Sequence, residues 1–289
     1  MLKYFVYIYI FSLLLANVCA TAGRRKGTPR MDLLEEAWTG KWFPYDPSEK
    51  ASTKQELSSH TCDYGNNNVI GIDFNPANKT HSYNYLCLDN RSIYTPNMQR
   101  VAVLTEHFIP PAYEAPVKCL NESITYEEAI PTFGPHRLFA PKYGEYTFLP
   151  PQRWLQSLAN GAIVMLYHPC AFPSQITVLK NILNSCLYRH IITPSQQLSR
   201  ERPIALLAWG KLLQMSVVDD HIVAKFIKQN AKQGPNCNQN EVLPPQLYDA
   251  ALLSEARLVT DEADSEVCGY KLQRRPLEQT NRVINCRDV

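Results

Sequence analysis

The longest uninterrupted apolar runs in the middle of the chain predict two buried strands. Residues 162–167 (AIVMLY) lie between Gly161 and Pro169, and residues 203–209 (PIALLAW) end at Gly210. Short apolar runs bounded by glycine and proline suit strands that are covered on both faces. We therefore expect these two strands to form the centre of a small sheet.

Segments with helical spacing lie beside these runs. Apolar side chains recur every three or four residues over about 175–190 and over 220–232, and Asp219 is a favourable N-cap for the second segment. A short helix is expected over 152–158 and a further one over 244–259. Helices that alternate with buried strands indicate an α+β fold or a layered α/β fold.

The N-terminal part has the pattern of a β-rich region. Residues 69–74 (VIGIDF), 83–88 (YNYLCL) and 101–108 (VAVLTEHF) are rich in β-branched or aromatic side chains. Clusters of Asn, Pro and Gly separate these runs, as is typical of strands joined by turns. The sequence therefore predicts three strands before residue 130.

The first residues of the chain predict the compartment. Residues 1–20 combine a basic start at Lys3, an apolar stretch and small residues up to Ala20, which is the pattern of a secretory signal peptide. No later segment has the roughly 18 consecutive apolar residues of a membrane span. We expect a flexible segment over 21–59 and one disulfide-linked domain over 60–289.

Cysteines and glycosylation sequons agree with secretion. Three Asn-x-Ser/Thr triplets give Asn78, Asn90 and Asn121 as glycosylation sites. Removal of the leader leaves an even number of cysteines, for which an oxidising compartment predicts four disulfides without fixing which cysteines pair. These cysteines are Cys62, Cys87, Cys119, Cys170, Cys186, Cys237, Cys268 and Cys286.

Composition and missing motifs exclude several classes of protein. The net charge of +2 is too small for a dedicated nucleic-acid binder. The chain has no Cys-x-x-Cys, no Gly-x-Ser-x-Gly and no glycine-rich phosphate loop. We therefore expect no cofactor and no structural metal, and a thiol oxidoreductase is a minor alternative.

The middle of the chain contains four motifs, at residues 131–136, 144–146, 151–155 and 161–169. Together they resemble a domain of unknown function that bacterial and animal proteins share, and the animal branch is the p-fifty-three-inducible protein thirteen-like family. The resemblance covers about residues 130–235. It implies an extracytoplasmic domain and, for the animal branch, a negative effect on cell growth. The likeness continues through 202–210 and 226–235.

One part of the family pattern is replaced in this chain. Members of the family carry His-x-x-Glu-His-Gly before the strand, where two imidazoles and a carboxylate would share one helix face. Here Gln156, Ala159 and Asn160 occupy these positions, followed by the matching Gly161. Because these side chains neither titrate near neutral pH nor form a metal-ligand set, the chemistry that the pattern implies is expected to be absent.

Two functions remain open from the sequence. The leader, sequons and paired cysteines favour a secreted glycoprotein that acts as a non-catalytic interaction or signalling module with a protein partner. The alternative is a metal-dependent hydrolase in which His136, Glu145 and His168 are the binding candidates. His136 is equally compatible with a buried histidine that bonds loop backbone, and His168 with a structural role at a strand end.

Overall fold

The fold is described from a computed structural model, which describes residues 62–63, 73–89, 92–237 and 246–269. All of these residues lie in one compact unit that spans 45–289. The predicted signal peptide at 1–20 and the segment 21–59 lie outside the described residues, as do Asn90 and Cys286. The domain boundaries therefore stay predictions.

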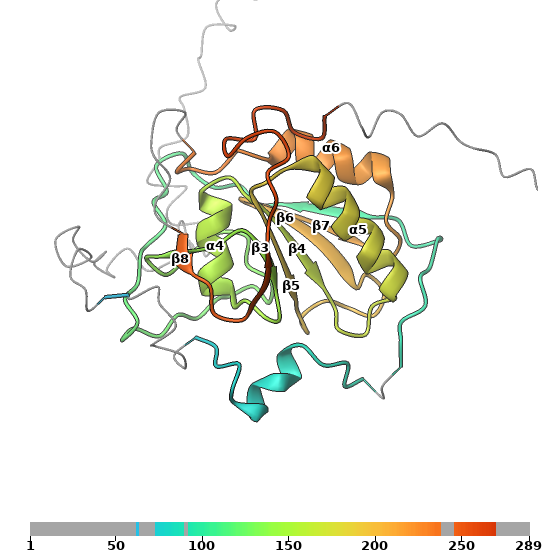
Figure 1. Cartoon of the computed structure of the whole chain (residues 1–289), viewed down its shortest axis with the longest axis horizontal. Coiled ribbons are helices and arrows are strands. Elements are labelled where there is room, and N and C mark those ends of the chain that lie inside the picture. The colour runs from blue at the N-terminus through green and yellow to red at the C-terminus, as the bar shows by residue number, and fades with distance from the viewer. Residues whose placement is uncertain (1–61, 64–72, 90–91, 238–245, 270–289) are drawn as a thin grey trace, which may run out of the picture. The chain divides into compact units, whose positions relative to one another are not determined.

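A seven-stranded mixed sheet organises the described residues, and with its helices it confirms the α+β class (Figure 1). The strand order is β1-β7-β6-β4-β5-β3-β9, and a separate two-stranded sheet joins β2 to β8. The strands are β1 (Val103–Glu106), β2 (Ala140–Pro141), β3 (Gly144–Tyr146), β4 (Ile163–Tyr167), β5 (His190–Pro194), β6 (Ile204–Ala208), β7 (Lys211–Met215), β8 (Gln246–Tyr248) and β9 (Leu252–Glu255).

The centre of the sheet is a βαβ unit followed by a hairpin. Strands β4 and β5 are parallel and joined by helix α5 (Pro173–Cys186), because parallel neighbours need a long crossover connection. Strand β6 pairs antiparallel with β4 on its other side, and β7 returns along β6 after a turn at Gly210. The two strands predicted from apolar runs are therefore β4 and β6.

Helices cover both faces of this sheet. Helix α5 and helix α6 (Asp220–Asn230) lie on one face, where their aliphatic side chains meet those of alternate strand residues such as Met165 and Leu206. Helix α4 (Pro151–Ala159) lies on the other face, against the intervening residues such as Val164 and Leu207. Side chains of successive strand residues point to opposite faces, so each central strand contributes to both cores.

Local sequence explains where the helices begin and end. The Asp219 carboxylate accepts hydrogen bonds from the backbone N–H groups of His221 and Ile222, which confirms it as the N-cap of α6. Helix α5 ends at Cys186, earlier than the predicted 175–190, because the following residues turn back to form β5. The short helix expected at 152–158 is α4.

Two predictions of secondary structure are wrong. The predicted helix at 244–259 is wrong, because this segment contains the two strands β8 and β9, which belong to different sheets. Ala251 lies between them at a φ of 65°, which a helix does not accommodate. Residues 83–88 form no strand, since the 3-10 helix η2 (Lys79–Asn84) occupies part of them. The run at 101–108 does contain β1, and most of 69–74 lies outside the described residues.

Position 144 requires glycine because two strands approach each other closely there. Gly144 begins β3 with a φ of 144°, and it pairs with both β5 and β9. A Cβ atom at this position would lie 2.1 Å from the carbonyl oxygen of Ser254. The sheet therefore requires a residue without a side chain where β9 crosses the start of β3.

Candidate functional site

His136 is a buried structural residue of the loop that precedes α4. Its backbone forms an isolated bridge with Val117, donates to the Pro116 carbonyl and accepts from the Lys118 N–H. The ring Nδ1 lies 2.9 Å from the Arg137 carbonyl oxygen, and the side chain is almost wholly buried. Burial lowers the pKa of His136, although the hydrogen bond with that carbonyl opposes the shift. This environment holds a neutral imidazole that bonds loop backbone.

Glu145 is an ion-pair partner on β3. Its Oε1 atom lies 2.5 Å from the Nζ of Lys180, which extends from α5, and both side chains are about one-quarter exposed. The Lys180 ammonium also lies 5.3 Å from the centre of the Tyr167 ring. Glu145 thus links the helix to the sheet edge.

His168 follows β4 and takes part in a short hydrogen-bonded chain. Its Nδ1 accepts the backbone N–H of Cys170 at 3.0 Å, so in the neutral ring Nε2 carries the proton. That Nε2 lies 3.5 Å from the hydroxyl of Tyr94, which in turn donates to Asp89 at 2.9 Å. Burial lowers the pKa of His168, and the Asp89 charge opposes the shift.

These three candidates bond to different partners. Among the described residues, no contact joins His136, Glu145 and His168 to one another. The same part of the chain contains no group of three His, Cys, Asp or Glu side chains arranged to hold a metal ion. Glu145 lies on β3 and His168 directly follows β4. Strand β5 separates these two strands in the sheet.

The helix face that replaces the family's ionisable pattern is filled by protein contacts. Gln156 donates to the Leu138 carbonyl oxygen at 2.6 Å, and Ala159 accepts the backbone N–H of Asn236 at 2.9 Å. Asn160 lies 3.4 Å from the side-chain amide of the same Asn236. All three residues, of which Asn160 is the C-cap of α4, are buried, so this face lies inside the protein.

A cluster of buried charges lies beside α4, and the sequence pattern did not predict it. Arg153 makes a bidentate ion pair with Asp63, at 2.7 and 3.2 Å, and its Nε donates to Asp73 at 3.0 Å. Arg137 reaches the same Asp73 from the preceding loop at 2.9 Å, and Gln152 donates to it at 3.1 Å. The four charged side chains are at most 3% exposed. We call Asp63, Asp73, Arg137 and Arg153 the α4 charge cluster.

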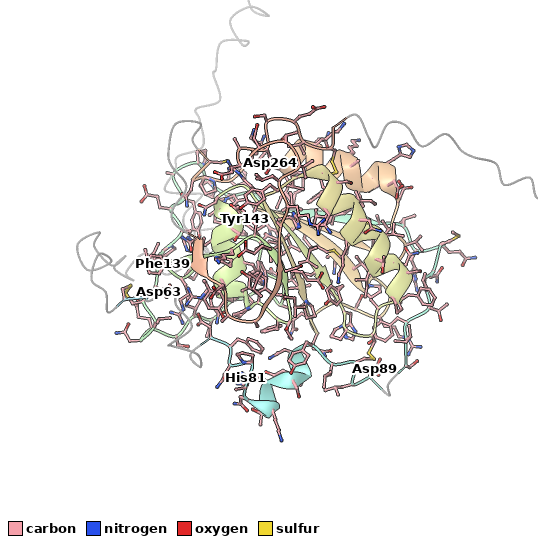
Figure 2. The ribbon with its side chains drawn as sticks, viewed as in Figure 1. Asp63, His81, Asp89, Phe139, Tyr143 and Asp264 are labelled. Atoms are coloured by element: carbon pink, nitrogen blue, oxygen red, sulfur yellow. A yellow bond between two sulfur atoms is a disulfide. The ribbon has the colours of Figure 1, made fainter. Side chains whose placement is uncertain are left out.

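The surrounding backbone completes the hydrogen bonds of the α4 charge cluster. Arg137 donates to the carbonyl oxygens of Cys119 and Glu122, and Arg153 to that of Phe139. Figure 2 shows Asp63 beside Phe139, whose N–H donates to this carboxylate at 3.0 Å. Fully paired charges of this kind hold loops in place, and the cluster does not leave a charged group open toward solvent.

Asp73 is held ionised by its neighbours. Burial alone would raise the pKa of Asp73, but the hydrogen bond from Arg137 and the charges of Arg153 and Arg137 hold it below its usual value. The stability that this carboxylate contributes is therefore present at neutral pH and is lost as pH falls through its folded-state pKa. The role that follows from this geometry is structural.

A second polar cluster lies where the segment after β9 meets the loop before β5. The buried Asp264 accepts the backbone N–H groups of Tyr188 and Arg189, at 2.5 and 2.9 Å, and its own carbonyl accepts from Lys232. Burial raises the pKa of Asp264. The Arg189 guanidinium lies 3.8 Å from the sulfur of Cys237. These contacts fix the segment that follows β9 against the start of β5.

Three disulfides join distant parts of the chain. The pairs are Cys62–Cys119, Cys87–Cys170 and Cys186–Cys268. Six of the eight predicted cysteines are therefore paired. Cys237 has no disulfide partner among the described residues, and Cys286 lies outside them. The fourth predicted disulfide thus stays a prediction.

Two of the three sequons can be placed. Asn121 is exposed in the loop after Cys119, and Asn78 is the N-cap of η2. The side-chain oxygen of Asn78 accepts both the N–H and the hydroxyl of Thr80, at 3.0 and 2.7 Å. This arrangement uses the oxygen of the amide, while glycan attachment takes place on its nitrogen.

The missed cluster left only a weak signal in the sequence. Arg153 precedes Trp154 and Leu155 on a short helix, and a single arginine at the start of a helix does not indicate a buried ion pair. Its partners Asp63 and Asp73 come 80 to 90 positions earlier in the chain. Such separation gives no periodic pattern, so sequence alone does not predict the pairing.

The fold and these contacts define the class of protein as a disulfide-stabilised α+β domain. Residues 117–242 match a protein family described as "Protein of unknown function (DUF3105)", and these residues include the predicted family core at about 130–235. Nothing in the match ties the chain to the animal p-fifty-three-inducible protein thirteen-like branch. The comparisons with curated proteins and with solved structures found no match.

The described helices are all too short or too polar to cross a membrane.

Proposed function

We propose that the chain is a secreted, glycosylated interaction module that works without catalysis and binds a protein partner. The observation that carries this proposal is the filled face of α4. Gln156, Ala159 and Asn160 all contact neighbouring backbone or the Asn236 amide. A catalytic site at the place where the family pattern puts its ionisable residues would need groups that can bind a substrate or exchange protons.

The disulfides support secretion. Disulfides persist in oxidising compartments and are rare in reducing ones. Three of them, with sequence separations of 57, 83 and 82 residues, close large loops of the described chain. The apolar leader at 1–20 and the sequons at Asn78 and Asn121 agree with the same compartment.

Secretion and glycosylation are tested by expressing the full chain in eukaryotic cells and analysing the medium. We expect the protein in the medium, starting after Ala20, with a mass that falls on enzymatic removal of N-linked glycan. Asn121→Gln and Asn78→Gln should each remove one glycan, whereas Asn236→Gln, outside any sequon, should remove none. Retention of an unprocessed, unglycosylated chain in the cytosol would contradict the proposal.

The absence of catalysis is tested against a metal-dependent hydrolase built on His136, Glu145 and His168. We expect the secreted protein to contain well below one equivalent of zinc or manganese and to bind neither metal at micromolar concentration. Because His136 is buried and its loss can unfold the loop, the variant to test is Glu145→Gln. One equivalent of metal, lost in Glu145→Gln with the fold intact, would favour the hydrolase.

The interaction itself is tested by adding labelled protein to cultured cells. We expect saturable binding that unlabelled protein displaces. The resemblance to the animal branch adds a growth-regulatory effect to the proposal, for which the readout is cell number after addition of purified protein. Binding that rises linearly with concentration, without displacement, would count against a protein partner.

A further inference from the structure

One edge of the large sheet is exposed and apolar. Strand β1 is the last strand on its side, and all four of its residues are exposed. It pairs with β7 along one side, and among the described residues no strand pairs with its other side. An edge strand with unpaired N–H and C=O groups is a template for another strand.

Exposed apolar side chains also come before and after this strand along the chain. Met98 and Phe108 are each 88% exposed, and Val101 is 73% exposed. Leu104 on the strand itself is about half exposed. No proline interrupts residues 97–109, so the usual device that blocks an edge strand is missing here. We call residues 98–108 the β1 edge.

The hydrogen bonds of β1 fix which backbone groups point outward. The N–H of His107 donates to the Gly210 carbonyl at 2.8 Å, on the side of β7. In an antiparallel ladder, alternate residues direct both backbone groups to the same neighbour. The backbone groups of Thr105 and Val103 therefore point toward β7, while the N–H and C=O groups of Ala102 and Leu104 point away from it.

A second copy of the same strand fits this outward pattern in one register. When two β1 strands run antiparallel with Val103 on the two-fold axis, Ala102 of each copy lies opposite Leu104 of the other. Both members of that pair then point their backbone groups at the partner, as a hydrogen-bonded pair requires. Beyond the strand, the exposed Phe108 follows β1 by two residues, and the exposed Met98 lies in the turn that the bond from the Arg100 N–H to the Asn97 carbonyl oxygen closes.

Charge favours this register over the neighbouring one. With Val103 on the axis, the register extended beyond β1 brings Arg100 of each copy, which ends the turn at 97–100, across from Glu106 of the other. This arrangement gives two identical cross-strand ion pairs. A shift that moves Leu104 to the axis would instead place Arg100 opposite Phe108. Opposite charges directly across a strand pair are stabilising, and like charges are destabilising.

We propose that two copies of the chain associate through an antiparallel pairing of their β1 edges, which joins the two seven-stranded sheets into one. This inference rests on the proposed interaction role and names one partner, the chain itself. The sequence of the β1 edge is complementary to itself in charge, and this favours a second copy over an unrelated strand. A closed two-fold contact also leaves no β1 edge free for further growth.

The ion pairs already present at the edge do not oppose this contact. Arg100 lies 2.9 Å from Glu201, and Glu106 lies 3.4 Å from Lys211. Each of these side chains is at least 38% exposed. Exposed pairs of this kind contribute little and rearrange readily, so the four charges can also serve the contact between copies.

The first experiment measures the mass of the secreted full chain by light scattering or sedimentation over a range of concentrations. We expect a dimer for the unmodified protein. Arg100→Glu and Glu106→Arg should each raise the dissociation constant about tenfold or more, because each places like charges opposite each other twice. Glu201→Gln, which removes only the pair within one copy, is the control and should leave the dimer intact.

Mixing the two charge-reversed variants provides the sharpest test. A heterodimer of Arg100→Glu with Glu106→Arg restores both opposite-charge pairs, so it should form where neither variant dimerises alone. Recovery of the dimer on mixing supports the β1 contact and its register. Failure to recover, with both variants folded by circular dichroism, would overturn the proposal.

A disulfide trap tests the position of the axis. Two Val103→Cys chains should cross-link to each other without added linker, since residues of a non-hydrogen-bonded pair have Cα atoms about 4.5 Å apart. Leu104→Cys should cross-link poorly and serves as the matched control. Cross-linking of Leu104→Cys but not of Val103→Cys would overturn the proposed register.

Other outcomes separate this inference from the proposed function. A monomer at all accessible concentrations would overturn the dimer, even if the protein is secreted and binds cells. Slow amide exchange on Ala102 and Leu104 in such a monomer would show that another part of the chain covers the edge. A dimer that none of these substitutions affects would use another surface, and the β1 contact would be wrong.

Discussion

Two helices, α5 and α6, cover one face of the large sheet with aliphatic side chains such as Leu183 and Ile227, whereas α4 covers the other with a different chemistry. Around α4 the core contains Trp154 and Tyr146, and behind that helix lies the α4 charge cluster. One face therefore depends on shape and apolar area, and the other also depends on the pairing of buried charges. Apolar packing tolerates small shifts, but a buried charge requires its partner at a defined distance.

The largest expected effect comes from removing the shared carboxylate of the α4 charge cluster. Asp73→Ala leaves Arg137 and Arg153 buried without that partner, and we expect a loss of about 4 kcal/mol in the free energy of unfolding. Urea unfolding measures this loss. Glu201→Ala, which breaks only an exposed ion pair, is the control and should change stability by less than about 0.5 kcal/mol. Similar small effects for both variants would show that the cluster is not structural.

On the sheet face that α5 and α6 cover, which we call the aliphatic face, a cavity should lower the free energy of unfolding by somewhat less. Leu183 on α5 is fully buried, and Leu183→Ala is expected to lower the free energy of unfolding by about 3 kcal/mol. Val178→Ala on the same helix removes an exposed side chain and should cost less than about 0.5 kcal/mol. The difference between the two variants in urea unfolding reports the packing of this face. Equal losses would mean that α5 does not pack as described.

The sheet face that α5 and α6 cover contains a buried histidine, which should make stability depend on pH. His190 is fully buried at the start of β5, opposite Ile163, and its Nδ1 lies 2.9 Å from the Leu187 carbonyl oxygen. Burial lowers the pKa of His190 to about 4. The unfolded chain binds a proton near pH 6.5, before the folded one does, so stability is lost as pH falls below that value.

For this histidine we expect a loss of about 2 kcal/mol between pH 7 and pH 5. The measurement is urea unfolding at both pH values for the unmodified protein and for His190→Gln. The contribution of the other histidines cancels in that comparison, and the variant should lose about 2 kcal/mol less on acidification. The same pH dependence in both proteins would contradict a buried neutral His190.

The smallest effect on stability is expected for a substitution at Gln156 on α4. Gln156 is buried, but its Oε1 atom has no hydrogen-bond partner within the described residues. Gln156→Met gives up one hydrogen bond to Leu138 and also removes that unpaired oxygen, so stability should change by no more than about 1 kcal/mol. Gln152→Met, which removes a donor to Asp73, is the matched comparison and should cost more. Thermal unfolding of both variants ranks them.

The aliphatic face could be predicted from sequence more completely than the α4 face. Strands β4 and β6 and helices α5 and α6 follow from apolar runs, helical spacing and the Asp219 cap. These signals are local, because each depends on residues within one element. Strand β5 was missed, because the predicted helix extended to about residue 190, where β5 begins, and no strand was predicted after it.

Long-range contacts account for what the sequence did not predict. Strand β9 is short and was taken for helix, because its partner β3 precedes it by more than a hundred residues. The separate roles of His136, Glu145 and His168 depend on neighbours from other loops, such as Tyr94 and Lys180. The even cysteine count predicted disulfides, but the three pairings came only from the structure.

The same long-range pairings set an order of events during synthesis. Strand β3 is made early, yet its antiparallel neighbour β9 leaves the ribosome more than a hundred residues later. At about 5–20 residues per second, this is a delay on the order of ten seconds. Strand β1 waits a similar time for β7. The nascent chain therefore carries an incomplete sheet for many seconds, during which chaperones and disulfide-forming enzymes have access to it.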